Sequence, residues 1–373
     1  MRALPALLLV LALGMNAPAT GFPPPAPAAE EWEKPSLHVG DPAPALAVGT
    51  WCKGEPVERF ERGHIYVVEF FATYDPACRD DWKHLAALQE QWGKRVLTVV
   101  GVATRTARES EPVSAFVERM GDRMGFRVGV DEGGKCEQAW MRSAQRYSLP
   151  CAVVVDRDGK VAWIGSVRCG LAGVVESIMN NTFSYEQQAR SDARFADLER
   201  QFTDARREGE WDKAFAVLDE AKRFRPETAA MVEATRFEVM LTEKQDAGAA
   251  YTLAQKIITN ELKDEERLLR RVAGVIAENP AVKNRNWDVA LAAVQQAVKA
   301  TGGRDGWALG ALAEIQFRRG EVEQAVQTQI KAMIVAEGDP HLSPRAGEAM
   351  DRYRIAQSKG TGDKVITTVP GTD

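Results

Sequence analysis

The sequence is poor in histidine, and its second half has no cysteine. The four histidines show no ligand-like spacing to the cysteines, which argues against a metal site; they are His38, His64, His84 and His341. The net charge of −5 provides no basic surface for nucleic acid. Beyond the N-terminus no segment is apolar enough to span a membrane. The 45% hydrophobic and 27% charged residues are an ordinary globular balance, and 373 residues suffice for two domains.

The N-terminus has the pattern of an export signal. Met1-Arg2 is weakly positive, residues 3–15 form an apolar run, and small residues suited to cleavage follow. We therefore predict a signal peptide and the start of a proline-rich linker over residues 1–28, then linker over residues 29–39. The mature protein is expected in the periplasm or outside the cell, with no membrane span after cleavage. The alternative is a membrane-anchored helix, although the run falls short of the ~20 residues that a span needs.

All the cysteines lie in the first half of the chain, and an exported protein is permitted to form disulfides. They are Cys52, Cys78, Cys136, Cys151 and Cys169. Because five is an odd number, at least one thiol has no intramolecular partner. We expect one disulfide among Cys52, Cys136 and Cys169, with the pairing left open. Structural disulfides plus a buried thiol are the alternative to a redox role.

Residues 40–183 alternate strand and helix patterns, which predicts an α/β domain. Short apolar, β-rich runs predict the strands 65–71, 96–102, 151–155 and 161–164. Helical spacing predicts the helices 78–92, 112–120 and 135–147. The last two strands are joined by Asp156-Arg157-Asp158-Gly159, a turn sequence typical of a hairpin. We predict a sandwich with a central mixed sheet and flanking helices.

Residues 70–79 read Phe-Phe-Ala-Thr-Tyr-Asp-Pro-Ala-Cys-Arg. Together with residues 53–57, 139–141, 149–156 and 163–165, this segment resembles exported TlpA-like and AhpC/TSA-type redoxins of the thioredoxin superfamily. The resemblance covers residues 40 to 180 and implies a thioredoxin-like fold. It also implies thiol–disulfide exchange with exported protein thiols or disulfides, and no organic cofactor.

The resemblance assigns roles to three residues and shows two departures. Asp75 stands where the family has its first, nucleophilic cysteine, and only the second, Cys78, remains as the reactive sulfur. Glu69 matches the buried acid that carries the proton of that cysteine, and Pro150 matches the cis-proline that shapes the substrate-binding edge. Cys151 replaces the usual Thr or Ser after that proline. Cys78 and Cys151 are therefore a candidate relocated redox pair, provided that their Cα atoms lie within ~7 Å.

Simpler interpretations of the same residues remain open. Asp75-Pro76 suits a helix start, because Asp is a favoured N-cap and Pro a favoured first helical residue. A carboxylate at Asp75 disfavours a thiolate at Cys78, since like charges repel. Cys78 would then be an inert, half-buried thiol, and Glu69 a charged residue at a sheet edge.

Residues 184–357 contain strong helix formers and a repeated pattern. The segments around Trp211, Gly248, Trp287 and Val322 resemble one another at spacings near the 34-residue tetratricopeptide period. We predict an all-α domain of four tetratricopeptide-like repeats, whose groove would bind a peptide or protein ligand; a plain helical bundle is the alternative. Residues 358–373 are predicted to be a disordered tail.

Two functions follow as hypotheses. The first is an exported thioredoxin-fold protein with weakened or altered thiol–disulfide oxidoreductase activity, because the nucleophilic cysteine is replaced. The alternative is a non-catalytic scaffold that binds a protein partner. The sequence leaves open whether the protein is an enzyme, its substrate or partner, its disulfide pairing and its oligomeric state.

Overall fold

The computed structural model describes residues 36–93, 96–104, 111–336, 339 and 342–359. The chain forms two compact units, Met1–Asp204 and Ala205–Asp373. The predicted signal peptide, the linker up to residue 35 and the tail from residue 360 lie outside the described residues. Within the described ranges, no helix combines the length and the apolar character needed to cross a membrane.

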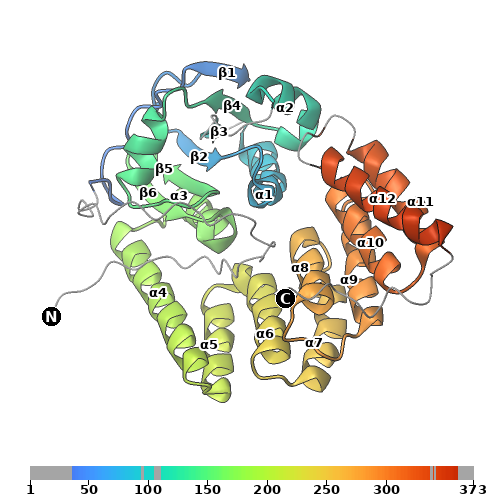
Figure 1. The fold of residues 1–373 in the computed structure, drawn as a ribbon. Helices are drawn as coiled ribbons and strands as arrows, with labels where there is room; N and C mark the ends of the chain where they lie inside the picture. Colours follow the sequence, from blue (N-terminus) through green and yellow to red (C-terminus); the bar gives the residue numbers. More distant parts are fainter. Residues whose placement is uncertain (1–35, 94–95, 105–110, 337–338, 340–341, 360–373) are drawn as a thin grey trace, which may run out of the picture. The chain divides into compact units, whose positions relative to one another are not determined.

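The first unit is built on a six-stranded mixed sheet with the order β1-β4-β3-β2-β5-β6 (Figure 1). The strands are β1 (Thr50–Lys53), β2 (Ile65–Phe71), β3 (Leu97–Ala103), β4 (Arg127–Val130), β5 (Cys151–Val155) and β6 (Val161–Gly165). Neighbours β2, β3 and β4 are parallel, while β1, β5 and β6 pair antiparallel with their neighbours.

The helical segments complete a β2-α1-β3 unit and a β5-β6-α3 unit around this sheet. They are α1 (Pro76–Trp92), α2 (Val113–Met120), η2 (Gly121–Met124), η3 (Glu137–Arg142), η4 (Val167–Leu171) and α3 (Ala172–Met179). This arrangement is the predicted thioredoxin-like fold.

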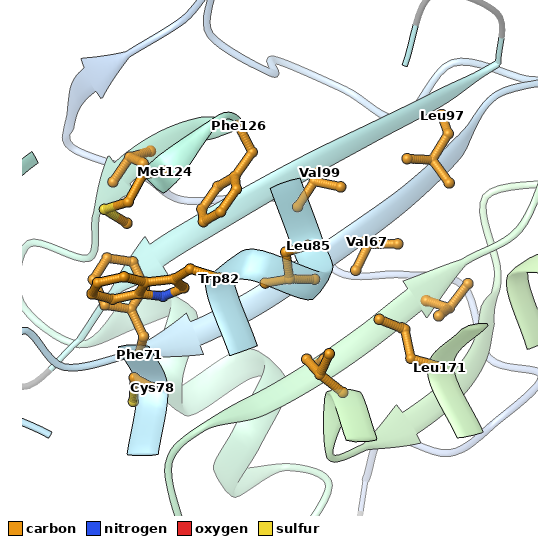
Figure 2. Packing of buried hydrophobic residues seen from close by; sticks show 14 of the residues in the cluster. Val67, Phe71, Cys78, Trp82, Leu85, Leu97, Val99, Met124, Phe126 and Leu171 are labelled. Carbon is orange, nitrogen blue, oxygen red and sulfur yellow. The ribbon is translucent and has the colours of Figure 1, made fainter. Parts of the chain in front are cut away.

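The two faces of the sheet bury two separate hydrophobic clusters. Side chains of successive strand residues point to opposite faces, so Val67 and Phe71 of β2 contribute to one cluster and Val68 and Phe70 to the other. The first cluster lies beneath α1, α2, η4 and α3, and Figure 2 shows Trp82 of α1 packed beside Phe71 of β2 within it. The second cluster includes residues of η3 and of the segment before β2. Side chains that belong to different clusters therefore lie on opposite faces of the sheet.

Three details differ from the sequence-based expectation. The helix predicted over residues 135–147 starts at residue 135 but ends at Arg142, and Glu137–Arg142 has π-type geometry, because the amide of Ser143 bonds the carbonyl of Gln138 five residues earlier. Gln145 then takes a positive φ of 54°, which ends the helical path. Strands β1 and β4 and helix α3 were not predicted; each strand is only four residues long.

Helix α4 (Tyr185–Arg207) follows the first domain and contains the boundary between the two units. Beyond it the described chain is helical. The segments are α5 (Trp211–Phe224), η5 (Pro226–Thr228), α6 (Ala229–Thr242), α7 (Ala247–Thr259), α8 (Glu266–Glu278), α9 (Trp287–Ala300), α10 (Gly306–Arg318), α11 (Val322–Val335) and α12 (Ser343–Ser358). The predicted all-α character of this domain is confirmed.

Successive helices of the second unit pack on one another in a regular order. Helix α6 contacts α8, α7 contacts α9, α8 contacts α10, and α10 contacts α12. Buried alanines at the contacts, such as Ala254, Ala290 and Ala297, let the helices approach closely. This order is consistent with helical repeats. The tetratricopeptide-like assignment and the number of repeats remain predictions.

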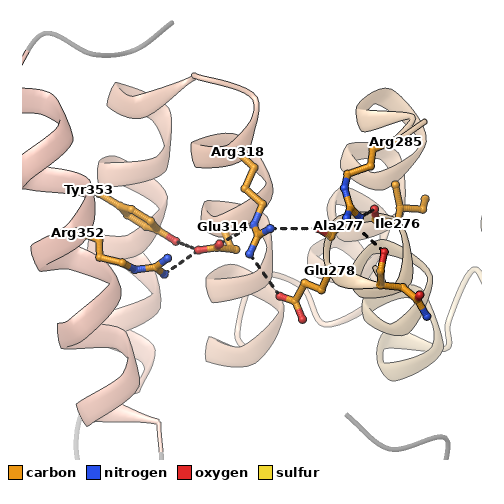
Figure 3. Close-up of polar contacts among 9 residues, drawn as sticks. Ile276, Ala277, Glu278, Arg285, Glu314, Arg318, Arg352 and Tyr353 are labelled. Atoms are coloured by element: carbon orange, nitrogen blue, oxygen red, sulfur yellow. Dashed lines mark hydrogen bonds and ion pairs between the residues drawn. The ribbon is translucent and has the colours of Figure 1, made fainter. Parts of the chain in front are cut away.

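Ion pairs accompany this stacking. Arg271 of α8 bonds Glu238 of α6 at 2.9 Å, and Arg352 of α12 bonds Glu314 of α10 at 2.9 Å. Arg318 of α10 lies 3.9 Å from Glu278 of α8 and donates to the carbonyl of Ala277 at 3.0 Å (Figure 3). An arginine of one helix thus reaches a glutamate of an earlier helix at each of these steps.

Candidate functional site

The start of α1 is a capped helix N-terminus. Asp75 has an extended backbone conformation, and its Oδ1 accepts a hydrogen bond from the amide of Ala77 at 2.8 Å. Pro76 occupies the first turn, where its missing N–H leaves no helical hydrogen bond unmade. The carboxylate thus satisfies one of the free amides at this helix end. Where the redoxin signature has its first cysteine, this chain has an N-cap.

Cys78 lies in the first turn of α1, and its amide donates to the carbonyl of Asp75 at 3.1 Å. Its side chain is fully buried in the cluster that contains Phe71 and Trp82 (Figure 2). Burial raises the pKa of this thiol well above its ordinary value, and the nearby Asp75 and Glu69 carboxyl groups raise it further. Since the thiolate is the nucleophile in disulfide exchange, Cys78 rests in its unreactive form at neutral pH.

Glu69 occupies the middle of β2, on the same sheet face as Val67 and Phe71 and hence on the side of Cys78. Its side chain is fully buried, and neither carboxyl oxygen has a hydrogen-bond partner among the described residues. Burial raises the pKa of Glu69 well above its ordinary range, and Asp81 adds to the shift. Glu69 is therefore an acid inside the core whose neutral form is favoured by burial, and it lies on a central strand and not at a sheet edge.

Asp81 is a site residue that the sequence analysis did not single out. It is buried on α1, three residues after Cys78, which places both on one face of the helix. Its carboxyl group raises the pKa of both Glu69 and Cys78. In the sequence, only its position three residues after Cys78 could have indicated that Asp81 lies near the thiol.

Pro150 and Cys151 lie at the start of β5. The Leu149–Pro150 peptide bond is cis, as the resemblance implies. Cys151 pairs with Phe70 in the sheet and is buried in the second cluster. Burial raises the pKa of Cys151 to about 12; Arg146 opposes this shift and Glu69 adds to it. A buried thiol of this kind is not a ready nucleophile.

The structure brings some of the predicted site residues together and separates others. Glu69 and Cys78 share the sheet face beneath α1, whereas Cys151 belongs to the cluster on the opposite face. Cys52, Cys78, Cys136 and Cys151 are free thiols. The disulfide expected among Cys52, Cys136 and Cys169 is therefore not formed in this structure, and neither is a Cys78–Cys151 bond. Among the described residues no three His, Cys, Asp or Glu side chains come close enough to hold a metal ion.

The first domain has a thioredoxin-like fold and is similar to redoxins in sequence, so we call it the redoxin domain. Residues 39–164 match the AhpC/TSA family. The chain is 33% identical over 137 residues to protein FixW of Rhizobium leguminosarum, a match that takes in 35% of this chain and 62% of that protein, so it spans less than two thirds of FixW.

Solved structures are also similar to part of this chain. A thiol-disulfide isomerase from Corynebacterium glutamicum is 21% identical, over 33% of this chain and 85% of its own, with a TM-score of 0.29. A thiol:disulfide interchange protein of the thioredoxin family from Chlorobium tepidum is 22% identical, over 39% of this chain and 97% of its own, with a TM-score of 0.30.

Proposed function

We propose that this protein is an exported redoxin whose thiol–disulfide chemistry is weakened, because Asp75 replaces the nucleophilic cysteine. The observation that carries the proposal is the state of Cys78: a fully buried thiol, with its pKa raised by burial and by the carboxyl groups of Asp75 and Glu69. A redoxin with two cysteines keeps one of them exposed as a ready thiolate. This site keeps only the buried member.

The chemistry left to such a site is one-step exchange. The Cys78 thiolate would attack one sulfur of a partner disulfide, form a mixed disulfide with it and release the other sulfur as a thiolate. Because Asp75 stands where the redoxin signature has its other cysteine and Cys151 lies on the opposite sheet face, an external thiol must then attack the mixed disulfide to regenerate Cys78. Pro150 would shape the edge at which an exported protein segment docks, and Glu69 would take up or return the Cys78 proton.

Restoring the missing cysteine tests this proposal directly. The Asp75→Cys substitution places a thiol at the helix N-terminus, three residues before Cys78, where helix dipole and free amides favour a thiolate. We expect at least a tenfold gain in dithiothreitol-driven insulin reduction over the unmodified protein. Asp75→Ser is the matched control, because Ser also caps a helix and has no thiol. Equal activity of the unmodified protein and the Asp75→Cys variant would contradict the weakened-site proposal.

Export is a separate part of the proposal and needs its own test. Fusion of residues 1–39 to a reporter that is active only outside the cytoplasm should give activity, and Leu8→Arg in the apolar run should abolish it. The N-terminal mass of the secreted protein would then show where cleavage occurs. Reporter activity that is indifferent to the Leu8→Arg change would argue against the predicted signal.

A non-catalytic scaffold is the second candidate, and one observation favours it. Helix α11 of the second domain exposes large apolar side chains; these are Ile330, Met333, Ile334 and Val335. Apolar residues gathered on one helix are typical of a protein-binding surface. If the protein is only a scaffold, Cys78→Ser should leave its cellular role intact, whereas Ile334→Asp should abolish it.

A further inference from the structure

Neither oxygen of the buried Glu69 carboxyl group has a hydrogen-bond partner in the described part of the chain. Its sheet partners are Gly101 on β3 and Ala152 on β5, which offer no polar side chain. On its own face it is surrounded by apolar residues such as Val67 and Phe71. An ionised carboxylate at this position would be costly, because neither hydrogen bonds nor water would replace its hydration shell.

Among the described residues, the titratable groups whose electrostatic coupling to Glu69 is resolved are all acidic. Asp81 and Cys78 of α1 lie on its side of the sheet, whereas Cys151, at the start of β5, lies on the opposite face. A charge on any of these groups would be negative and would repel an ionised Glu69. The free energy of that repulsion is relieved only if water reaches the carboxylate or the facing groups move away.

The element best able to move is the beginning of α1. Strand β2 is held on both sides, by seven register pairs to β3 and five to β5. The first turn of α1 is held by the Asp75 cap and by side-chain packing of Cys78 and Trp82 on the sheet. Helix ends open at a lower free energy than central strands do, and this one carries two of the groups that face Glu69.

We propose that Glu69 is a pH-sensitive switch: when its carboxyl group ionises, the first turns of α1 open and the Cys78 thiol becomes accessible. The switch acts on the same Cys78 thiol as the proposed function. It rests on that function, because exposing Cys78 matters only if the thiol exchanges with disulfides. At low pH Glu69 is neutral and α1 stays closed over Cys78. At high pH the same opening that lets water reach Glu69 also exposes the sulfur.

The first test is amide hydrogen exchange of the full chain between pH 5 and pH 9, followed by mass spectrometry and corrected for the intrinsic pH dependence of exchange. In the unmodified protein, protection of the α1 amides should fall by up to about tenfold per pH unit, the limit for one linked proton. Glu69→Gln and Glu69→Leu should each remove this pH dependence. Glu90→Gln, a change at an exposed residue of the same helix, should preserve it.

Two results would overturn the switch: protection of α1 that does not change with pH, or a pH dependence that persists in both Glu69 variants. Two substitutions of Glu69 are used so that, if one of them prevents folding, the pH dependence can still be measured in the other.

A second readout separates the switch from the proposed function. Mixed-disulfide formation between Cys78 and oxidised glutathione, measured by mass spectrometry at the same pH values, should rise as α1 opens. If α1 opens and Cys78 still forms no mixed disulfide, the proposed function is wrong and the switch stands. If Cys78 reacts equally at every pH while α1 stays protected, the switch is wrong and the proposed function stands.

Discussion

Glu69 in the first domain and Glu314 in the second are both shielded carboxyl groups, yet their surroundings are opposite. Glu69 has no hydrogen-bond partner among the described residues. Glu314, whose side chain is 19% exposed, accepts from Arg318 at 2.7 Å, from Arg352 at 2.9 Å and from the Tyr353 hydroxyl at 2.8 Å (Figure 3). Burial raises the pKa of Glu69, whereas Arg352 and Arg318 outweigh burial and hold the pKa of Glu314 below its ordinary value.

The difference shows how each domain uses a shielded charge. In the helical domain the carboxylate joins α10 to α12, and its partners satisfy it fully. In the redoxin domain an unpartnered acid is kept beside a cysteine, an arrangement that reduces stability and is typical of functional sites. The first domain thus places a buried acid, without a hydrogen-bond partner among the described residues, beside Cys78, on a helix that begins at the Asp75 N-cap.

The largest change in stability is expected from breaking the hydrogen-bond network around Glu314. Glu314→Ala leaves Arg318, Arg352 and the Tyr353 hydroxyl without their common partner, so the unfolding free energy of the helical domain should fall by about 3 kcal/mol. Hydrogen exchange under increasing denaturant would resolve the two domains in the full chain.

Asp288→Asn is the control for this prediction, because Asp288 pairs with Arg319 but is 88% exposed. Its effect should stay within about 0.5 kcal/mol. Equal losses from the two variants would mean that the Glu314 network contributes no more than an exposed ion pair.

Replacing Glu69, which has no hydrogen-bond partner among the described residues, is expected to raise stability instead of lowering it. Glu69→Leu replaces a buried carboxyl group with an apolar side chain of similar size, so the redoxin domain should become more stable at pH 7 by about 2 kcal/mol. The helical domain should not change. A loss of stability in the redoxin domain would show that Glu69 makes a favourable contact in the folded state.

The two domains should also respond to pH in opposite directions. The raised pKa of Glu69 gives a contribution to stability that is fully present below the ordinary Glu value, ~4.3, and is lost as pH rises through the folded-state pKa. The lowered pKa of Glu314 gives a contribution that is present above ~4.3 and is lost as pH falls through the folded-state pKa. Domain-resolved denaturation at pH 4, 5.5 and 7 would test this. Parallel changes in both domains would contradict it.

Much of the fold could be predicted from the sequence because local patterns agree with tertiary packing. The runs 65–71 and 151–155 are fully buried strands, and their apolar, β-rich composition indicates this directly. Strands β1 and β4 were not predicted because four residues are too few for a pattern to stand out. The helix predicted over 135–147 was too long because the chain turns at Gln145 before Pro150, which the helical periodicity does not reveal.

The candidate site was only partly accessible from the sequence. The N-cap role of Asp75 follows from local preferences and is confirmed. The relation between Cys78 and Cys151 depends on which sheet face each occupies, and that is set by the strand register around Phe70. Asp81 was missed because one acidic residue in a charged helix start looks like any solvated residue until the packing of α1 is known.

The smallest effect concerns the charge of Asp75 itself. Asp75→Asn keeps a side-chain oxygen that can cap α1, but it removes the negative charge that helps to raise the pKa of Cys78. The thiolate fraction should increase, and iodoacetamide should alkylate Cys78 about two- to fivefold faster at pH 8. Asp75→Ala separates charge from capping, because it removes both and should also cost about 1 kcal/mol of stability. An alkylation rate that rises in the Ala variant and not in the Asn variant would assign the protection of Cys78 to the cap, so that Asp75 would act on the thiol by holding the helix closed and not through its charge.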